Sequence, residues 1–283
     1  MSDRPRLPEW LKKHAPDPAA LARMKRLVDG LQLHTVCESA NCPNQGECFV
    51  RGTATFMILG DVCTRNCTFC AVETGRPLPV DPAEPEHLVE AVRRLGIRHV
   101  VITSVTRDDL DDGGALQFAG CIEAVRAFDP SITVEVLIPD FQGSLPALKL
   151  VLDSSPTVLN HNVETVPRLY PEVRPQANYE RSVELLWRAR SEAPGIITKS
   201  GLMVGLGETF PEVVEVMEDL REVDCDLLTV GQYLRPSANH HPVVRFVTPP
   251  EFDEYRSLAE GKGFKAVASA PFVRSSFHAA EML

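Results

Sequence analysis

The sequence predicts an α/β fold in which a partial barrel of parallel strands carries an extension at each end. From about Thr53 onward, short β-rich runs alternate with amphipathic helical stretches, and such alternation is typical of βα units around a parallel sheet. The 283 residues suit one barrel-sized unit. Six or seven units fit an open or closed barrel better than a flat sheet, and a doubly wound sheet stays open as the alternative.

The expected elements follow one another along the chain. Residues 17–31 predict a helix before the barrel, with Asp17 as its cap and Pro18 at its first position. The expected strands lie in TATFMILG, HVVITSV, TVEVLIP, TVLNHNVE, TKSGLMVGL, LLTVGQYL and KAVASAP. The expected helices between them lie in PEHLVEAVRRLG, GALQFAGCIEAVRAF, YERSVELLWRAR and PEVVEVMEDLREV. We expect three parts: residues 1–52 as an N-terminal extension, 53–270 as the barrel, and 271–283 as a C-terminal segment.

Polar residues follow the expected strands. CTRNCTFC comes after the first strand, TRDDLDDGG after the second, GLGE after the fifth and GQYLRP after the sixth. The carboxyl ends of barrel strands meet at one face, where functional groups of such folds gather. We therefore expect the functional site at that face.

Composition narrows the class of protein. The chain is 44% hydrophobic and 24% charged, which is ordinary for a globular protein. Its net charge of -10 argues against general binding to nucleic acid or to an anionic membrane. No apolar run approaches the roughly 18 residues of a spanning helix, and the first residues lack the apolar core of a signal peptide. We therefore expect a cytoplasmic protein.

The eight cysteines indicate metal or redox chemistry, because the cytosol keeps thiols reduced. Six of them lie between Cys37 and Cys70. The other two, Cys121 and Cys225, stand in apolar surroundings and are expected to be core thiols.

Cys63, Cys67 and Cys70 have the spacing C-x3-C-x2-C. So tight a turn can direct three thiolates at one centre, and thiolate is the ligand that iron-sulfur clusters prefer. A four-iron cluster with three protein ligands keeps one iron open, as a catalytic zinc keeps a position for substrate. Two alternatives stay open, namely a structural zinc site completed by a distant His or Cys, and a ferredoxin-like electron carrier.

The motif, with aromatic Phe69 before its last cysteine, resembles the signature of the radical S-adenosylmethionine (SAM) superfamily. A second triple upstream, Cys37, Cys42 and Cys48, has the spacing C-x4-C-x5-C. Two local triples suggest two clusters, although one shared site is an alternative. The sequence resembles the lipoyl synthase family in seven segments: ESANCPNQGECF, GDVCTRNCTFCAV, TSVTRDDLDDGGA, LNHNVETVPRLY, SGLMVGLGE, VGQYLRPS and RSSFHA.

That resemblance implies a (β/α)6-type TIM barrel of the radical SAM kind, two 4Fe-4S clusters, and SAM as cofactor. It implies a sulfurtransferase that adds sulfur at C6 and C8 of an octanoyl group linked to a lysine of a carrier protein. The implied radical-generating residues are Cys63, Cys67 and Cys70, which hold the cluster that binds SAM. The implied sulfur source is an auxiliary cluster on the upstream triple.

The family's auxiliary cluster takes a fourth ligand from a serine in an R-S-S-Y motif. Ser276 matches that position, and Ser275 is the fallback if the register is wrong. Serine suits the role because its hard oxygen binds a soft cluster poorly and leaves an iron easy to uncover. Phe277 replaces the usual tyrosine, so only a packing role remains for it. A merely polar chain terminus is the alternative for this segment.

The resemblance also implies partners. They are an octanoylated lipoyl carrier, such as an E2 subunit or the glycine-cleavage H protein, an electron donor such as flavodoxin or ferredoxin, and an iron-sulfur carrier that rebuilds the auxiliary cluster. No nucleic acid or membrane partner is expected.

Candidate cofactor contacts lie at the strand ends. Gly113 and Gly114 would let the backbone approach the amino group of SAM, although an acidic turn capping the next helix is equally consistent with the sequence. Side chains that suit hydrogen bonds to the ribose or carboxylate, but that often serve as internal salt-bridge partners, are Asn162, Glu164, Lys199 and Arg235.

GLGE, residues 205–208, lacks the phosphate-loop patterns and is expected to form a cofactor or substrate wall. His240 and His241 are adjacent, and in an extended segment they would face opposite sides. They therefore cannot easily share one ion, and we expect them beside the entrance used by the carrier protein.

Two other function classes compete with a sulfur-inserting enzyme. A non-catalytic iron-sulfur carrier would also hold two clusters, but it would not cleave SAM. Another radical sulfur-inserting enzyme of the biotin synthase kind would not need the upstream cysteine triple.

Overall fold

The computed structural model describes residues 6–13 and 15–283. Its main sheet has the strand order β1-β2-β5-β6-β7-β8-β9-β10, and every neighbouring pair from β2 to β10 is parallel. In the described residues β10 pairs with β9 but not with β1 or β2, so the barrel is open. The predicted partial barrel is confirmed.

The seven parallel strands coincide with the seven predicted runs. They are β2 (Thr55–Ile58), β5 (His99–Ser104), β6 (Thr133–Leu137), β7 (Val158–Asn160), β8 (Ile197–Val204), β9 (Leu227–Gln232) and β10 (Ala266–Ala270). Most of their residues are buried, as expected for parallel strands covered on both faces. A small separate sheet pairs β3 (Val62–Cys63) with β4 (Glu73–Thr74) beside the barrel.

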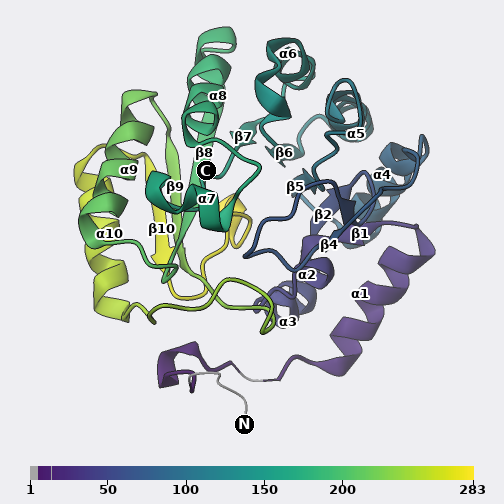
Figure 1. Cartoon of the computed structure of the whole chain (residues 1–283). Helices are drawn as coiled ribbons and strands as arrows, with labels where there is room; N and C mark the ends of the chain where they lie inside the picture. Colours follow the sequence, from purple (N-terminus) through teal and green to yellow (C-terminus); the bar gives the residue numbers. More distant parts are fainter. Residues whose placement is uncertain (1–5, 14) are drawn as a thin grey trace.

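Helices form an outer arc around the strands (Figure 1). They are α4 (Glu84–Leu95), α5 (Ala115–Phe128), α6 (Leu145–Asp153), α8 (Tyr179–Glu192), α9 (Phe210–Glu222) and α10 (Pro249–Gly261). The short helix α7 (Tyr170–Val173) lies instead near the centre of the view (Figure 1). Capping boxes begin α9 and α10, where Glu212 and Glu251 bind back to Thr209 and Thr248. Four predicted helices match α4, α5, α8 and α9, whereas α6 and α10 were not singled out from the sequence.

The N-terminal part joins the barrel at one sheet edge. Its elements are α1 (Pro18–Gly30), β1 (His34–Thr35), α2 (Val36–Ser39) and α3 (Gln45–Val50), and β1 pairs antiparallel with β2. Asp17 caps α1 as predicted, accepting a 2.9 Å hydrogen bond from the Ala19 amide. Residues 1–5 and 14 of the predicted extension lie outside the described residues.

Short 3-10 turns complete the chain, at Glu9–Leu11, Phe141–Gly143, Pro167–Leu169 and Ala279–Met282. Cys121 and Cys225 are fully buried in the apolar core, which confirms their prediction as core thiols. In the described part of the chain, no helix combines the length and the apolar character that crossing a membrane requires.

Candidate functional site

Cys63, Cys67 and Cys70 follow β2: Cys63 is the last residue of the short strand β3, and Cys67 and Cys70 lie in the loop after it. The sulfur of Cys63 accepts hydrogen bonds from the backbone amides of Arg65 at 3.4 Å and Thr106 at 3.3 Å. Burial, with smaller contributions from the neighbouring thiols Cys67 and Cys63, raises the pKa of Cys70 to about 12. The three thiols are therefore close enough to act on one another.

This donor set fits an iron-sulfur cluster. Buried, mutually repelling thiols stay protonated unless a cation replaces their protons, and amide donors to a sulfur stabilise its thiolate form. Among the residues that the structure describes, no three His, Cys, Asp or Glu side chains are grouped to hold a single metal ion. Ligands of a four-iron cluster bind separate irons and lie farther apart than the ligands of a single ion.

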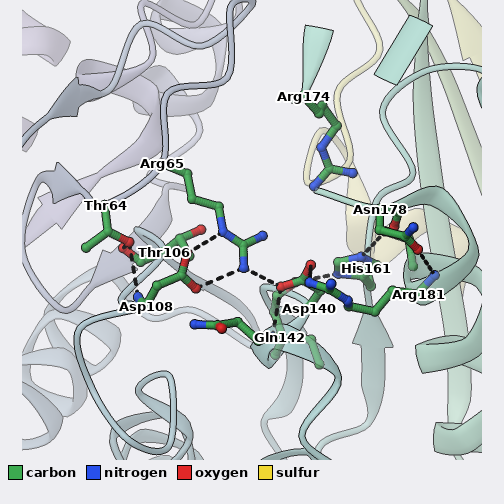
Figure 2. Close-up of polar contacts among 12 residues, drawn as sticks. Thr64, Arg65, Thr106, Asp108, Asp140, Gln142, His161, Arg174, Asn178 and Arg181 are labelled. Atoms are coloured by element: carbon green, nitrogen blue, oxygen red, sulfur yellow. Dashed lines mark hydrogen bonds and ion pairs between the residues drawn. The ribbon is translucent and has the colours of Figure 1, made fainter. Parts of the chain in front are cut away.

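The loop that carries the first triple is tied to two barrel strands by Arg65. Its guanidinium pairs with Asp108 in a bidentate contact at 2.6 and 2.9 Å and with Asp140 at 2.6 Å. Figure 2 shows Arg65 between these carboxylates, with Arg181 on the far side of Asp140. Asp108 follows β5 and Asp140 follows β6, so one buried arginine connects three loops. No pattern in the sequence marks Arg65 as functional.

His240 and His241 also contact the cluster loop. His240 Nε2 lies 2.9 Å from the carbonyl oxygen of Cys70, and the amide of His241 donates to the Thr68 carbonyl oxygen at 2.9 Å. The His241 ring instead reaches the Leu206 carbonyl oxygen at 2.8 Å. The prediction that the two rings do not share one ion agrees with these separate partners. Their expected place beside a carrier entrance stays a prediction.

Asn162 and Glu164 lie just beyond the carboxyl end of β7. The amide nitrogen of Asn162 donates to Glu164 Oε1 at 3.0 Å and to Ser275 Oγ at 2.6 Å. Asn162 Oδ1 is buried and has no hydrogen-bond partner within the described residues. Burial raises the pKa of the Glu164 carboxyl group, which the positive charge of Arg174 opposes. An unsatisfied buried acceptor fits a site that a polar ligand completes.

Arg174 is a second residue of the site that no pattern in the sequence marks as functional. It donates to the Asn162 carbonyl oxygen at 3.1 Å, and its charge opposes the burial that raises the pKa of Cys67. It therefore connects the cluster loop with the Asn162 region. No motif signal marks this arginine: its hydrogen-bond partners Asn162, Val163 and Tyr170 lie within twelve residues of it, and its proximity to Cys67 arises only in the fold.

Two predicted cofactor residues have structural partners instead. Lys199 is fully buried and pairs with Glu135 at 2.9 Å. It is the third residue of β8, near the amino end of the strand and away from the carboxyl ends where the site is expected. Arg235 donates to the carbonyl oxygens of His240, at 2.8 Å, and Ala238. It therefore supports the loop that carries the two histidines.

The turn TRDDLDDGG caps the helix that follows it, as the alternative interpretation expects. Asp112 accepts hydrogen bonds from the amides of Gly114 at 2.9 Å and Leu116 at 2.8 Å. A Cβ on Gly113 would lie 2.9 Å from the Phe141 ring, and one on Gly114 would lie 2.3 Å from Leu59. Both glycines also have positive φ. Close packing against Phe141 and Leu59 therefore accounts for both glycines, and the approach of their backbone to SAM stays a prediction.

The GLGE loop closes on itself. Glu208 accepts from the amides of Gly205, Leu206 and Gly207 at 2.6, 2.9 and 3.1 Å. Its carboxylate therefore satisfies the donors that an anion would otherwise bind. The role of this loop as a cofactor wall stays a prediction.

The second triple lines a cavity of about 160 Å³ under the C-terminal segment. Cys37 lies on α2 and Cys48 on α3, with Cys42 in the loop between them. Burial raises the pKa of Cys37 to about 12 and that of Cys48 to about 11. None of the other triple's cysteines lines this cavity, so the two triples occupy separate places.

Ser276 and Phe277 line the same cavity, whereas Ser275 does not. Thr55 Oγ1 donates to Ser276 Oγ at 2.7 Å. Ser276 is thus the serine whose oxygen shares the cavity with Cys37, Cys42 and Cys48, which supports the preferred register over the fallback. Phe277 also lines this cavity, a position that suits the packing role expected for it.

Comparison with known proteins identifies the family. The model of the radical SAM superfamily matches residues 57–220, and that of the N-terminal domain of lipoyl synthase of the radical SAM family matches residues 1–42. Lipoyl synthase of Caldanaerobacter subterraneus subsp. tengcongensis is 58% identical over 97% of this chain and 96% of its own. Lipoyl synthase of Methylococcus capsulatus is 57% identical over 97% of this chain and 85% of its own.

Solved structures share the fold at low identity. The FeFe-hydrogenase maturase HydG from Carboxydothermus hydrogenoformans has a TM-score of 0.62 at 16% identity, over 80% of this chain and 55% of that one. Methylornithine synthase has a TM-score of 0.56 at 14% identity, over 78% and 72%. From the sequence relatives and the family models together, the chain belongs to the lipoyl synthase family, a family of enzymes within the radical SAM superfamily.

Proposed function

We propose that this enzyme forms a lipoyl group by inserting two sulfur atoms, at C6 and C8, into an octanoyl group linked to a lysine of a carrier protein. The observation that carries the proposal is the separation of the two cysteine triples, of which only the upstream one shares its cavity with Ser276. Separate donor sets suit a division of labour between generating a radical and donating sulfur. A single shared cluster would need cysteines of both triples at one place.

On the radical side, Cys63, Cys67 and Cys70 are proposed to hold a 4Fe-4S cluster with one open iron. When bound, this cluster and SAM supply a 5′-deoxyadenosyl radical, which removes hydrogen from unactivated carbon. Asn162 is proposed to bind a donor group of SAM through Oδ1, which lacks a protein partner in the described residues. Glu164 holds the Asn162 amide in place.

Arg65 keeps the cluster loop at the carboxyl ends of β5 and β6 through its contacts with Asp108 and Asp140. Lys199 and Arg235 are occupied by Glu135 and by loop carbonyl oxygens. We therefore leave them outside the proposed cofactor site.

On the sulfur side, Cys37, Cys42, Cys48 and Ser276 are proposed to hold the auxiliary 4Fe-4S cluster, which is a substrate because it surrenders sulfide. The alkoxide of serine is a hard ligand, so the iron that it binds is the easiest to release. The proposed parts are residues 1–52, which supply the cysteines, 53–270, which form the radical SAM barrel, and 271–283, which supply Ser276.

The proposed partners are an octanoylated E2 subunit or H protein, an electron donor such as flavodoxin or ferredoxin, and an iron-sulfur carrier that restores the auxiliary cluster. A cytoplasmic location is proposed because six cysteines in two local triples suit iron-sulfur clusters, whose thiolate ligands the reducing cytosol keeps from forming disulfides.

The decisive experiment is anaerobic turnover of an octanoyl-lysine peptide by protein reconstituted with a heavy sulfur isotope as sulfide. Mass spectrometry should find the heavy isotope at both positions of the product. A Cys48→Ala control should cleave SAM without forming this product. No SAM cleavage beyond a protein-free blank would favour the carrier alternative, and thiolation by the Cys48→Ala protein would favour an enzyme of the biotin synthase kind.

A further inference from the structure

The side chains of two consecutive serines in the C-terminal segment lie in different sites. Ser276 Oγ lies in the cavity of the upstream cysteine triple, where it accepts from Thr55 Oγ1 at 2.7 Å. Ser275 Oγ accepts a 2.6 Å hydrogen bond from the side-chain amide of Asn162, beyond the end of β7. The proposed function uses Ser276 and leaves Ser275 without a role.

The Ser275 contact determines where the Asn162 amide lies. Both hydrogens of the Asn162 amide nitrogen have acceptors, Glu164 Oε1 at 3.0 Å and Ser275 Oγ at 2.6 Å. A primary amide has two donors and one carbonyl acceptor, so these contacts leave only Oδ1 for another molecule. That oxygen is buried and unpaired among the described residues. Ser275 and Glu164 together therefore hold one free acceptor in a defined direction.

The barrel wall is shaped around this contact. A Cβ on Gly201 of β8 would lie 3.0 Å from Asn162 Oδ1 and 3.4 Å from Ser275 Oγ. A Cβ on Gly231 of β9 would lie 2.1 Å from the carbonyl oxygen of Val273, in the same C-terminal segment. Glycine at both positions lets the segment lie directly against the strands, so Ser275 is held by the barrel as well as by Asn162.

We propose that Ser275 is a positioning residue for SAM. It fixes the Asn162 amide so that Oδ1 accepts a hydrogen bond from a donor group of the cofactor, an inference that rests on the proposed function of Asn162. Without the Ser275 hydroxyl, the Asn162 amide loses one of its two hydrogen-bond acceptors. Part of the free energy of SAM binding is then used to order the Asn162 side chain. The C-terminal segment would thus take part in both sites.

The test measures SAM affinity rather than activity, by anaerobic equilibrium dialysis of the reconstituted protein. Ser275→Ala should weaken SAM binding about three- to tenfold, the equivalent of one ordinary hydrogen bond. Its iron and sulfide content should equal that of the wild type, because Ser275 does not line the auxiliary cavity. Ser191→Ala, on the exposed face of α8, is the matched control and should leave the affinity unchanged.

The double variant separates positioning from a general loss of stability. If Ser275 acts through Asn162, then Asn162→Ala with Ser275→Ala should bind SAM as weakly as Asn162→Ala alone. Additive losses would overturn the inference, as would an affinity for Ser275→Ala that matches the Ser191→Ala control. An unaltered affinity in Asn162→Ala would overturn it too. Failure of the proposed function would appear differently, as wild-type protein that forms no isotope-labelled product.

Discussion

Asp140 accepts a 2.6 Å hydrogen bond from Arg65, and both side chains are buried. Replacing Asp140 removes one of the two carboxylates that compensate the buried charge of Arg65 and leaves only Asp108. Asp140→Ala should therefore lower the free energy of unfolding by about 3 kcal/mol, measured by anaerobic urea unfolding. The control is Lys149→Ala, which breaks an exposed pair with Glu192 and should cost less than about 1 kcal/mol. Equal losses in the two variants would show that the Arg65 contacts do not stabilise the loop.

Stability should fall as the pH drops below neutrality because of His161. Burial, with a smaller contribution from the nearby charge of Arg174, lowers the pKa of His161 to about 4. The unfolded chain binds a proton near pH 6.5, whereas the folded protein does not. Unfolding should thus become easier by about 2 kcal/mol between pH 7 and pH 5. The slope against pH should flatten in His161→Gln, and an identical slope in both proteins would contradict this assignment.

The two cysteine triples should have separable roles. Alanine in place of Cys63, Cys67 and Cys70 should abolish SAM cleavage, measured as 5′-deoxyadenosine by liquid chromatography. Alanine in place of Cys37, Cys42 and Cys48 should preserve cleavage at saturating SAM but stop thiolation. The wild type should hold about eight irons per chain, and each variant about half of that. Equal loss of cleavage in both variants would refute the division.

A cysteine in place of Ser276 should hold the auxiliary cluster more firmly. Thiolate matches the soft cluster better than serine oxygen does, so Ser276→Cys should retain its iron through a single turnover and give less thiolated product. Iron remaining on the protein and product formed are measured in the same sample. Product equal to that of the wild type would mean that ligand hardness does not control sulfide release.

Much of the fold follows from local sequence. The seven strands have short β-rich patterns, and the cap of α1 is set by Asp17 next to Pro18. The cysteine triples are equally local, since each depends on spacing within a dozen residues. Placing Ser276 in the cavity of the upstream triple depended on family resemblance, because more than two hundred residues separate it from Cys48.

The contacts that the sequence could not predict involve partners far apart in the chain. Lys199 has the residue type of a cofactor ligand, but Glu135 on β6 neutralises it inside the barrel. The space beside Gly114 is taken by Leu59, which no local pattern indicates. Arg65 connects the cluster loop to Asp108 and Asp140. The loops that carry these carboxylates meet only after the strands lie side by side.

Ser275 and Ser276 are joined by one peptide bond, so their Cα atoms are about 3.8 Å apart whatever the rest of the chain does. One hydroxyl binds Asn162 and the other lies among Cys37, Cys42 and Cys48. The two hydroxyls can therefore serve both sites at once only because the two serines are adjacent. Inserting a single residue between them would move one hydroxyl away from its site.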